Sequence, residues 1–381
     1  MEHPRPFLPE ELGVEILSWL PVKSLVRFRC VSKSWNSTIS DSQFIKLHLH
    51  RSYSTRNLDL AHLRSLITLP LENRPAIVET RPSCLLEYGF VETFNGLICL
   101  RFVSEYDREL KHYVSRVRLW NPATRSSSQP SPPLIHPTTC CYFGFGCDSS
   151  TDTYKVVAVM FSQHRFDQDR EKTVHVYNMG ATCWRTIQVP LLPCMDHASG
   201  AVYVSNSLNW VVALTWDVII YGKGELFNYD PYMIFSFDLG EEKCVQLSLP
   251  YCSRRRDEFN DFMPTLGVLR GCLCICQTQD KKIHFEIWHM KEFGVHESWT
   301  LLFNIANYES ITRNIDRWPC LTMYMSENDD ILLLSKSIYH PYEAQAVLYT
   351  HKDNDLQVMN IAKDIGDFYA NNYIESLVSP Y

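Results

Sequence analysis

A strand–turn–strand unit recurs through most of this chain and limits the folds that are open to it. Each copy has an aromatic residue in its first strand, a polar turn and a second strand, and a further short apolar run precedes it. The aromatic residues return at intervals of roughly 50–60 residues, near the kelch-like end of the propeller periods. They are Trp120, Tyr177, Phe237, Trp288 and Tyr349. Such a unit cannot bury its own faces, so neighbouring copies must stack. The repeat predicts an all-β, kelch-like β-propeller domain over residues 85–381.

The first part of the chain follows a different pattern. Pro9, Glu10 and Glu11 suit the start of a helix, and apolar residues then recur at helical spacing until Pro21. A second short helix is predicted over Val22–Phe28, and a third after Ser32, whose hydroxyl is a suitable N-cap. The fold class is therefore α+β and multidomain. We expect a helical domain over residues 1–50, a linker over 51–84 and the β domain over 85–381.

The helical region is small and rich in apolar residues, so its own core alone does not account for where all of them are buried. Three short helices in about forty residues lie near the lower size limit for independent stability. Patterning leaves two alternatives open. The apolar residues can face the region's own core and the downstream domain, or one face can pack on the helices of a partner.

Composition restricts the class of function. The net charge of −7 argues against nucleic acid, which binds basic surfaces. No apolar signal core opens the chain, and the longest apolar run, near Val211–Leu214, is too short to span a membrane. The fourteen cysteines include no CxxC pair, which argues against a zinc site and favours buried thiols in a reducing compartment. We expect an intracellular protein of the cytoplasm or nucleus.

Two stretches of the helical region carry a family resemblance. Residues 8–12 (LPEEL) and 15–35 (EILSWLPVKSLVRFRCVSKSW) resemble the F-box in its plant form. The resemblance implies a partner, the Skp-type adaptor, and through it a cullin. It also implies that Trp35 locks the third helix in the F-box core. The residues expected to face the adaptor are Leu8, Pro9, Leu12, Ile16, Leu17, Leu20, Pro21, Leu25 and Val31.

The β region carries a second resemblance, to the F-box-associated interaction domain of plants. The matching stretches are residues 94–99 (FNGLIC), 119–125 (LWNPATR), 143–148 (FGFGCD), 154–157 (YKVV) and 375–377 (ESL). Such domains bind a protein substrate, whose identity the resemblance does not give. We also expect residues 373–378 to pair near the first blade as a closing strand.

Candidate chemical sites are few, and no catalytic residue or cofactor is predicted. His284 and Glu286 would share one face of a strand while His289 points the other way, so we expect no metal site. No nucleophile signature surrounds any cysteine. The cluster Arg254, Arg255 and Arg256 is either a solvated loop tip or, as the weaker alternative, a contact for an acidic or phosphorylated substrate.

These observations predict a substrate-recruiting, non-catalytic subunit of an SCF-type (Skp-cullin-F-box) ubiquitin ligase. Two other hypotheses are open. A non-degradative scaffold would use the same two surfaces without promoting ubiquitination. A propeller enzyme would need a convergent metal or acid–base cluster, and the sequence indicates none.

Overall fold

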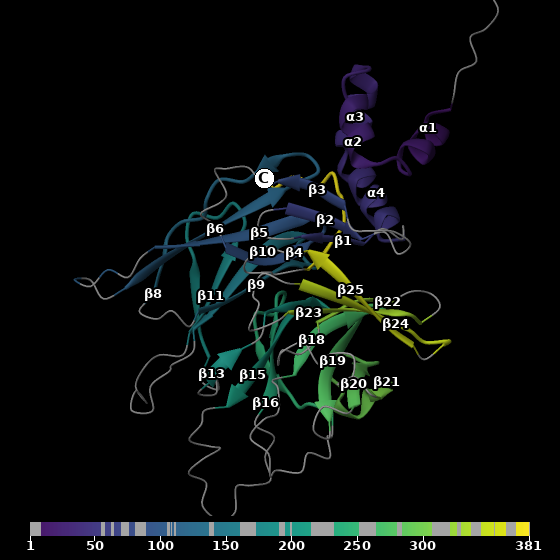
Figure 1. The fold of residues 1–381 in the computed structure, drawn as a ribbon. Helices are drawn as coiled ribbons and strands as arrows, with labels where there is room; N and C mark the ends of the chain where they lie inside the picture. Colours follow the sequence, from purple (N-terminus) through teal and green to yellow (C-terminus); the bar gives the residue numbers. More distant parts are fainter. Residues whose placement is uncertain are drawn as a thin grey trace, which may run out of the picture. The chain divides into compact units, whose positions relative to one another are not determined.

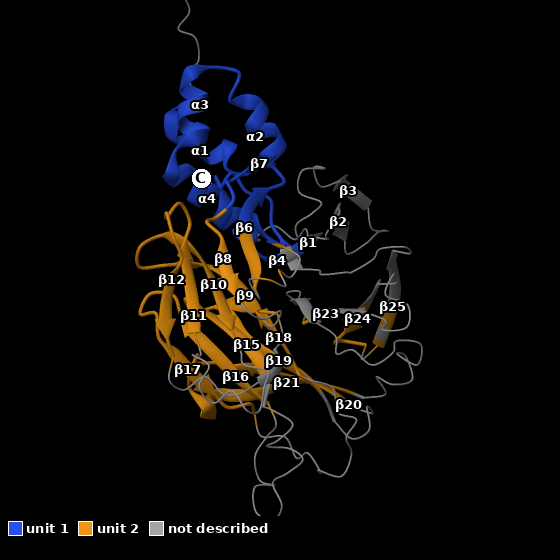
Figure 2. Ribbon diagram, turned by 90° about the vertical axis from the view of Figure 1, so that its left-hand side faces the viewer, with its two compact units in different colours: residues 1–102, 117–130, 371–381 blue, residues 103–116, 131–370 orange. Residues whose placement is uncertain are grey.

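The computed structural model divides into two compact units (Figure 2). The first unit contains residues 1–102, 117–130 and 371–381, and the second contains residues 103–116 and 131–370. The residues whose structure is described are 9–54, 58–61, 65–69, 76–80, 89–104, 107, 109, 112–136, 141–160, 173–189, 195–198, 200–214, 232–250, 264–279, 284–306, 321–325, 329–336, 344–353, 355–362 and 371–380.

The first unit begins with four helices (Figure 1). They are α1 (Glu10–Leu17), α2 (Val22–Phe28), α3 (Lys33–Ser40) and α4 (Ser42–Ser54). The predicted cap of α3 is confirmed, because the Trp35 backbone N–H donates to Ser32 Oγ at 3.1 Å. Asp41 caps α4 through its Oδ1, which accepts from the backbone N–H groups of Gln43 and Phe44 at 2.9 and 3.1 Å. The first helix ends at Leu17, earlier than the predicted stop at Pro21.

A sheet of short strands follows the helices in the same unit. Its strands are β1 (Leu58–Ala61), β2 (Ser65–Leu69), β3 (Ala76–Thr80) and β26 (Asn371–Tyr373), in the order β26-β1-β2-β3. These first three strands lie within residues 51–84, which were expected to be a linker or entry segment. The expected closing strand near the C-terminus is confirmed in part. Strand β26 pairs antiparallel with β1, with Tyr373 opposite Asp59, but residues 374–380 continue without regular secondary structure.

The remaining strands form antiparallel sheets of four or five strands. Their orders are β4-β5-β6-β7 with β8 on β6, β12-β11-β10-β9, β13-β15-β16-β17 with β14 on β15, β18-β19-β20-β21, and β22-β23-β24-β25. The bounds are β4 Gly89–Phe94, β5 Leu97–Val103, β6 Tyr113–Asn121, β7 Ser126–Ser127, β8 Leu134–His136, β9 Cys141–Asp148, β10 Thr153–Met160, β11 Thr173–Asn178, β12 Arg185–Gln188, β13 Met195–Ala198, β14 Val202–Val204, β15 Ser207–Leu214, β16 Tyr232–Asp238, β17 Cys244–Leu247, β18 Thr265–Leu269, β19 Cys272–Gln279, β20 His284–Met290, β21 Trp299–Ala306, β22 Leu321–Met325, β23 Ile331–Lys336, β24 Ala344–Thr350 and β25 Asp355–Ala362. The predicted fold class, a helical unit (α1–α4, residues 10–54) before a largely β region, is confirmed.

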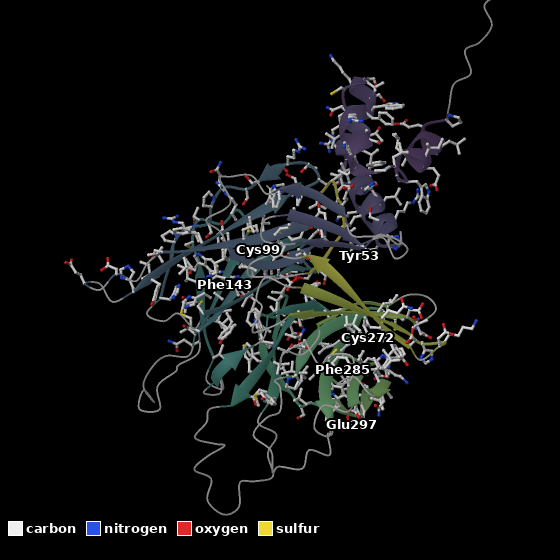
Figure 3. All side chains as sticks on the ribbon, in the orientation of Figure 1. Tyr53, Cys99, Phe143, Cys272, Phe285 and Glu297 are labelled. Carbon is white, nitrogen blue, oxygen red and sulfur yellow. The ribbon has the colours of Figure 1, made fainter. Side chains whose placement is uncertain are left out.

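Apolar layers between successive sheets build the core of the second unit. One layer joins Val157 and Val176 to Trp210, Phe235 and Phe237, all of them fully or almost fully buried. Two similar layers lie farther along the chain, and Phe285, which is labelled in Figure 3, belongs to the one that also holds Phe303 and Tyr349. Because these layers consist of side chains from different sheets, the sheets that contribute to them do not cover their faces alone.

Two tryptophans at or next to outer strands form hydrogen bonds to backbone carbonyls beside strands of the sheet that precedes theirs in the sequence. Trp184 Nε1 donates to the Pro132 carbonyl at 2.9 Å, and Trp299 Nε1 donates to the Ser248 carbonyl at 3.1 Å. Each bond satisfies the only polar group of a large apolar side chain.

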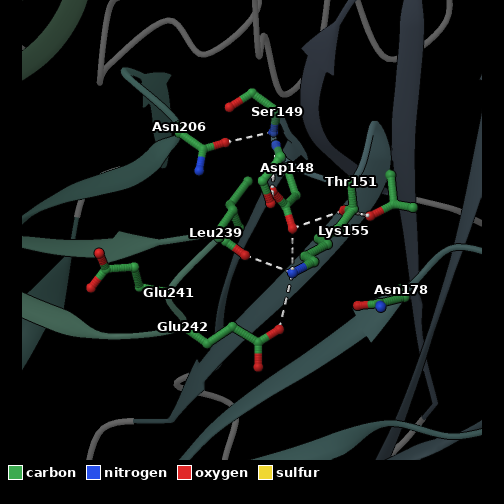
Figure 4. Close-up of polar contacts among 12 residues, drawn as sticks. Asp148, Ser149, Thr151, Lys155, Asn178, Asn206, Leu239, Glu241 and Glu242 are labelled. Carbon is green, nitrogen blue, oxygen red and sulfur yellow. Dashed lines mark hydrogen bonds and ion pairs between the residues drawn. The ribbon is translucent and has the colours of Figure 1, made fainter.

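A buried ion network links two neighbouring sheets of the second unit (Figure 4). The ammonium of Lys155 on β10 lies 2.9 Å from Asp148 Oδ2 and 3.0 Å from Glu242 Oε1, and it donates to the Leu239 carbonyl at 2.6 Å. Burial alone would raise the pKa of Asp148. Hydrogen bonds from Ser150, Lys155 and Thr151 outweigh that effect and hold the pKa well below its usual range.

Replacing Lys155 with Met should lower the free energy of unfolding by about 3–5 kcal/mol, because Asp148 would be left charged and buried without its cation. Urea denaturation followed by tryptophan fluorescence measures this loss. Lys243→Met is the matched control, since Lys243 pairs with Glu241 at a side-chain exposure of 72%. Equal unfolding midpoints for the two variants would contradict the structural role of the network.

Candidate partner-binding site

Exposed apolar side chains are concentrated on the helices. Of the eleven exposed large hydrophobic residues in the described part of the chain, six lie between residues 9 and 54. The exposed fractions are 52% for Leu12, 54% for Ile16, 57% for Trp19, 62% for Val31, 37% for Trp35 and 53% for Tyr53. Apolar surface gathered in so short a segment is typical of a site that binds another protein.

Helix α1 has apolar residues on two faces. Leu12 and Ile16 are four positions apart, so they lie on one face, and that face is exposed. Leu17 belongs to the opposite side and is buried in the helical core, with Val14 partly buried beside it. A helix of eight residues that is apolar on both sides can pack inward and still offer a second surface.

Arg51 on α4 holds the end of α1. Its Nη2 lies 2.6 Å from Glu15 Oε2, and its Nη1 donates to the Glu15 carbonyl at 3.0 Å and to Ser18 Oγ. The guanidinium also lies over the Trp19 ring, 4.7 Å from its centroid. The hydrogen bond from Arg51 lowers the pKa of Glu15. These contacts fix the orientation of α1 relative to α4.

His48 provides a second tie between α4 and the turn after α1. The ring is 3% exposed, and its Nε2 lies 2.9 Å from the Leu20 carbonyl, to which the neutral ring can donate. Burial lowers the pKa of His48, and the bond to Leu20 only partly opposes that effect. The helical unit therefore holds this histidine in its uncharged form near neutral pH.

Val31, after α2, and Trp35, on α3, add further exposed apolar surface to the helices. Trp35 on α3 packs edge-to-face on Phe28 of α2, with ring centroids 5.2 Å apart. The contact joins the two helices, and the expected role of Trp35 in locking the third helix stays a prediction. Trp35 is nevertheless 37% exposed, so it lies at the border of the core.

The C-terminal tail contributes to the helical core. Leu377 is 3% exposed and packs with Leu17, Val22, Leu25, Ile39 and Phe44. Residues 373–378 were expected to pair as a closing strand, and nothing in the sequence predicted that Leu377 contacts the helices. No local pattern links positions so far apart in the chain.

The structure divides the residues expected to face the adaptor. Those on the surface are Pro9, Leu12, Ile16, Pro21 and Val31, and Leu20 is half-buried. Leu17 and Leu25, at 5% and 0% exposure, are core residues of the helical unit itself, and their expected contact with the adaptor stays a prediction. Leu8 lies outside the described residues.

The structure does not bring the residues of the other candidate sites together in its described part. Arg254, Arg255 and Arg256 lie outside the described residues, as does the side chain of His284. Glu286 accepts hydrogen bonds from Trp288 Nε1 at 2.8 Å and from Gln277 Nε2 at 3.4 Å, so its carboxylate is engaged within its own sheet. In the described part of the chain, no group of three or more His, Cys, Asp or Glu residues could hold a metal ion. No helix there has the length and apolar character needed to cross a membrane.

Comparison with known proteins gives two domain matches that together span most of the chain. Residues 7–47 match the F-box domain, and residues 103–380 match the F-box associated beta propeller domain. An F-box/kelch-repeat protein of Arabidopsis thaliana is 31% identical over 80% of this chain and 81% of its own length. The F-box protein CPR1 of the same plant is 27% identical over 80% of this chain and 74% of its own.

Solved structures match far more weakly. The WD40 domain of SCAP from fission yeast aligns with a TM-score of 0.32 and 10% identity, covering 84% of this chain and 81% of that one. A likeness at this level supports no argument about function.

Acidification should destabilise the helical unit through His48. An unfolded histidine takes up a proton near pH 6.5, whereas the pKa of buried His48 is lower. The unfolded chain therefore binds more protons as pH falls below about 6.5, and stability is lost in that direction. We expect the melting temperature, followed by circular dichroism at 222 nm, to fall less between pH 7.5 and 5.5 for His48→Gln than for the wild type. The same change at exposed His50 is the control, and identical behaviour of the two variants would refute the assignment.

Proposed function

The chain belongs to the F-box proteins that carry an F-box associated β-propeller domain, and on that premise we propose that it recruits a target protein to an SCF-type ubiquitin ligase. The observation that carries the proposal is the exposed apolar face of α1, with Leu12 and Ile16 each more than half exposed. A Skp-type adaptor would cover this face, and the adaptor would connect the chain to a cullin.

The contact set follows from exposure. Leu12, Ile16 and Val31 would bury their side chains against the adaptor's helices, with Pro9, Leu20 and Pro21 around them. Leu17 and Leu25 would act from beneath, by holding the helices that carry the contact residues. Arg51 would keep α1 in place through Glu15 and Trp19.

The β domain would bind the target through loops held by its packed sheets, since loops on a rigid scaffold carry most recognition sites. The chain would contribute no chemistry to ubiquitin transfer. Its contribution would be proximity, because a target lysine held near the charged ubiquitin carrier reacts in an effectively intramolecular step.

The double variant Leu12→Asp, Ile16→Asp should bind a purified Skp-type adaptor at least about 100-fold more weakly than the wild type, because two contact residues of the interface would become charged. Isothermal titration calorimetry measures the change. Both side chains are exposed, so the circular dichroism spectrum should be retained. Leu17→Asp would not serve, since it charges the helical core.

The matched control places the same number of new charges on exposed apolar residues of the second unit. Val245→Asp with Leu301→Asp changes side chains that are 52% and 43% exposed, and it should leave adaptor affinity unchanged. Adaptor affinity that survives the changes at Leu12 and Ile16 would remove the basis of the assignment.

Whether the chain promotes ubiquitination of its target is tested with the full chain in cells under proteasome inhibition. If the chain is a ligase subunit, the double variant at Leu12 and Ile16 should still capture the wild-type's target, but the target's ubiquitination should fall. Capture with unchanged ubiquitination would instead indicate a non-degradative scaffold.

A further inference from the structure

The tail of residues 374–380 is irregular in structure, yet part of it is buried. Ser376 and Leu377 are 0% and 3% exposed. A buried segment without helix or strand must find partners for its backbone groups elsewhere. In this unit the partners come from two fixed points in the chain, Asn121 and the turn at Asn95.

Asn121 at the end of β6 holds the tail on both sides of Leu377. Its Nδ2 donates to the carbonyls of Ser376 and Val378, at 3.0 and 2.7 Å. Its Oδ1 accepts from the backbone N–H groups of Ala123 and Thr124, at 2.9 and 3.2 Å. The buried amide thus uses both donors and both lone pairs. With its two neighbours fixed, Leu377 has its backbone held in one place.

The turn between β4 and β5 is the second fixed point. Ser376 Oγ donates to the Asn95 carbonyl at 2.7 Å, and the Oδ1 of Asn95 accepts from the hydroxyl of Tyr53 at 3.0 Å. Tyr53 belongs to α4 and is labelled in Figure 3. One turn therefore contacts both the tail and the last helix of the helical unit.

Gly96 in this turn has no room for a side chain. Its φ is +76°, and a Cβ there would collide with Ser376 Oγ and lie 2.6 Å from the Ile374 carbonyl. The close approach of the tail to the turn depends on this glycine. Any larger residue would have to push the tail away.

From these contacts we propose that the tail is a clasp, defined as residues 374–378, which completes the helical core and positions the partner-binding helices. Leu377 fills the core next to Leu17 and Leu25, the side chains that support the exposed face of α1. Ser376 and Leu377 are thus positioning residues for a surface to which they do not belong. The consequence for adaptor affinity rests on the proposed function, whereas the consequence for helix stability does not.

Loss of the clasp should act locally. The cluster that contains Leu377 consists of residues of the helices and of the same unit, and it shares no residue with the three apolar layers of the second unit. Regions with separate cores can open independently. The helices should therefore loosen while the sheets of the second unit stay folded.

Gly96→Ala tests the clasp without altering the tail or the helices. The matched control is Gly271→Ala, because Arg270-Gly271 has nearly the same backbone as Asn95-Gly96, with φ values of 51° and 76° against 53° and 76°. A Cβ at Gly271 meets nothing within 4 Å. Both variants carry the same backbone strain, and only the first displaces the tail.

Hydrogen–deuterium exchange of the full chain, followed by mass spectrometry, is the primary measurement. Amides of α2, α3 and α4 should exchange at least about tenfold faster in Gly96→Ala and at the wild-type rate in Gly271→Ala. Leu377→Ala should reproduce the effect, because a truncated core leucine leaves a cavity, and Leu377→Met should restore most of the protection. Adaptor affinity measured on the same variants should fall in the same order.

Unchanged exchange of the helices in both Gly96→Ala and Leu377→Ala would overturn the clasp, whatever the adaptor does. Faster exchange spread over the sheets of the second unit would also overturn it, since it would indicate general destabilisation. A wild-type chain that binds no adaptor would refute the proposed function alone, because the exchange measurement needs no adaptor.

Discussion

The core of the four short helices includes one buried side chain from the other end of the chain, and this contact shapes the amino-terminal unit. A chain of about 45 residues is near the limit at which a core can be stable by itself. Here Leu377 is that buried side chain. Asn121 and the Asn95-Gly96 turn hold it there through hydrogen bonds that leave the buried tail satisfied. Because the core is closed by the tail, the apolar residues on the outer face of α1 are free to serve a partner.

The β region serves a different physical purpose. Its sheets bury their faces against one another through aromatic and aliphatic layers, and Lys155 joins two of them through a buried ion network. Such a scaffold can hold loops rigidly without any catalytic group. The proposed recruiting role requires this division, with one surface for the adaptor, another for the target, and a rate gained by proximity.

Much of this fold could be predicted from local sequence. Proline and acidic residues mark the start of α1, Ser32 caps α3, and short continuous apolar runs mark strands such as β10 and β19. Which of two adjacent apolar residues faces inward could not be predicted. Ile16 and Leu17 are equally suited to a core, and a helix of only two turns gives too short a period to assign them. The pairing of β1 with β26 and the role of Leu377 depend on contacts between the two ends of the chain, which no local pattern records.

The central claim is that the outer face of the helical unit is where this chain meets a Skp-type adaptor. Hydrogen–deuterium exchange of the wild-type chain, with and without a saturating amount of purified adaptor, tests it most directly. The account predicts slower exchange in residues 9–35 on complex formation, with unchanged exchange in the strands of the second unit. Protection confined to the β domain, or no complex at all, would contradict it.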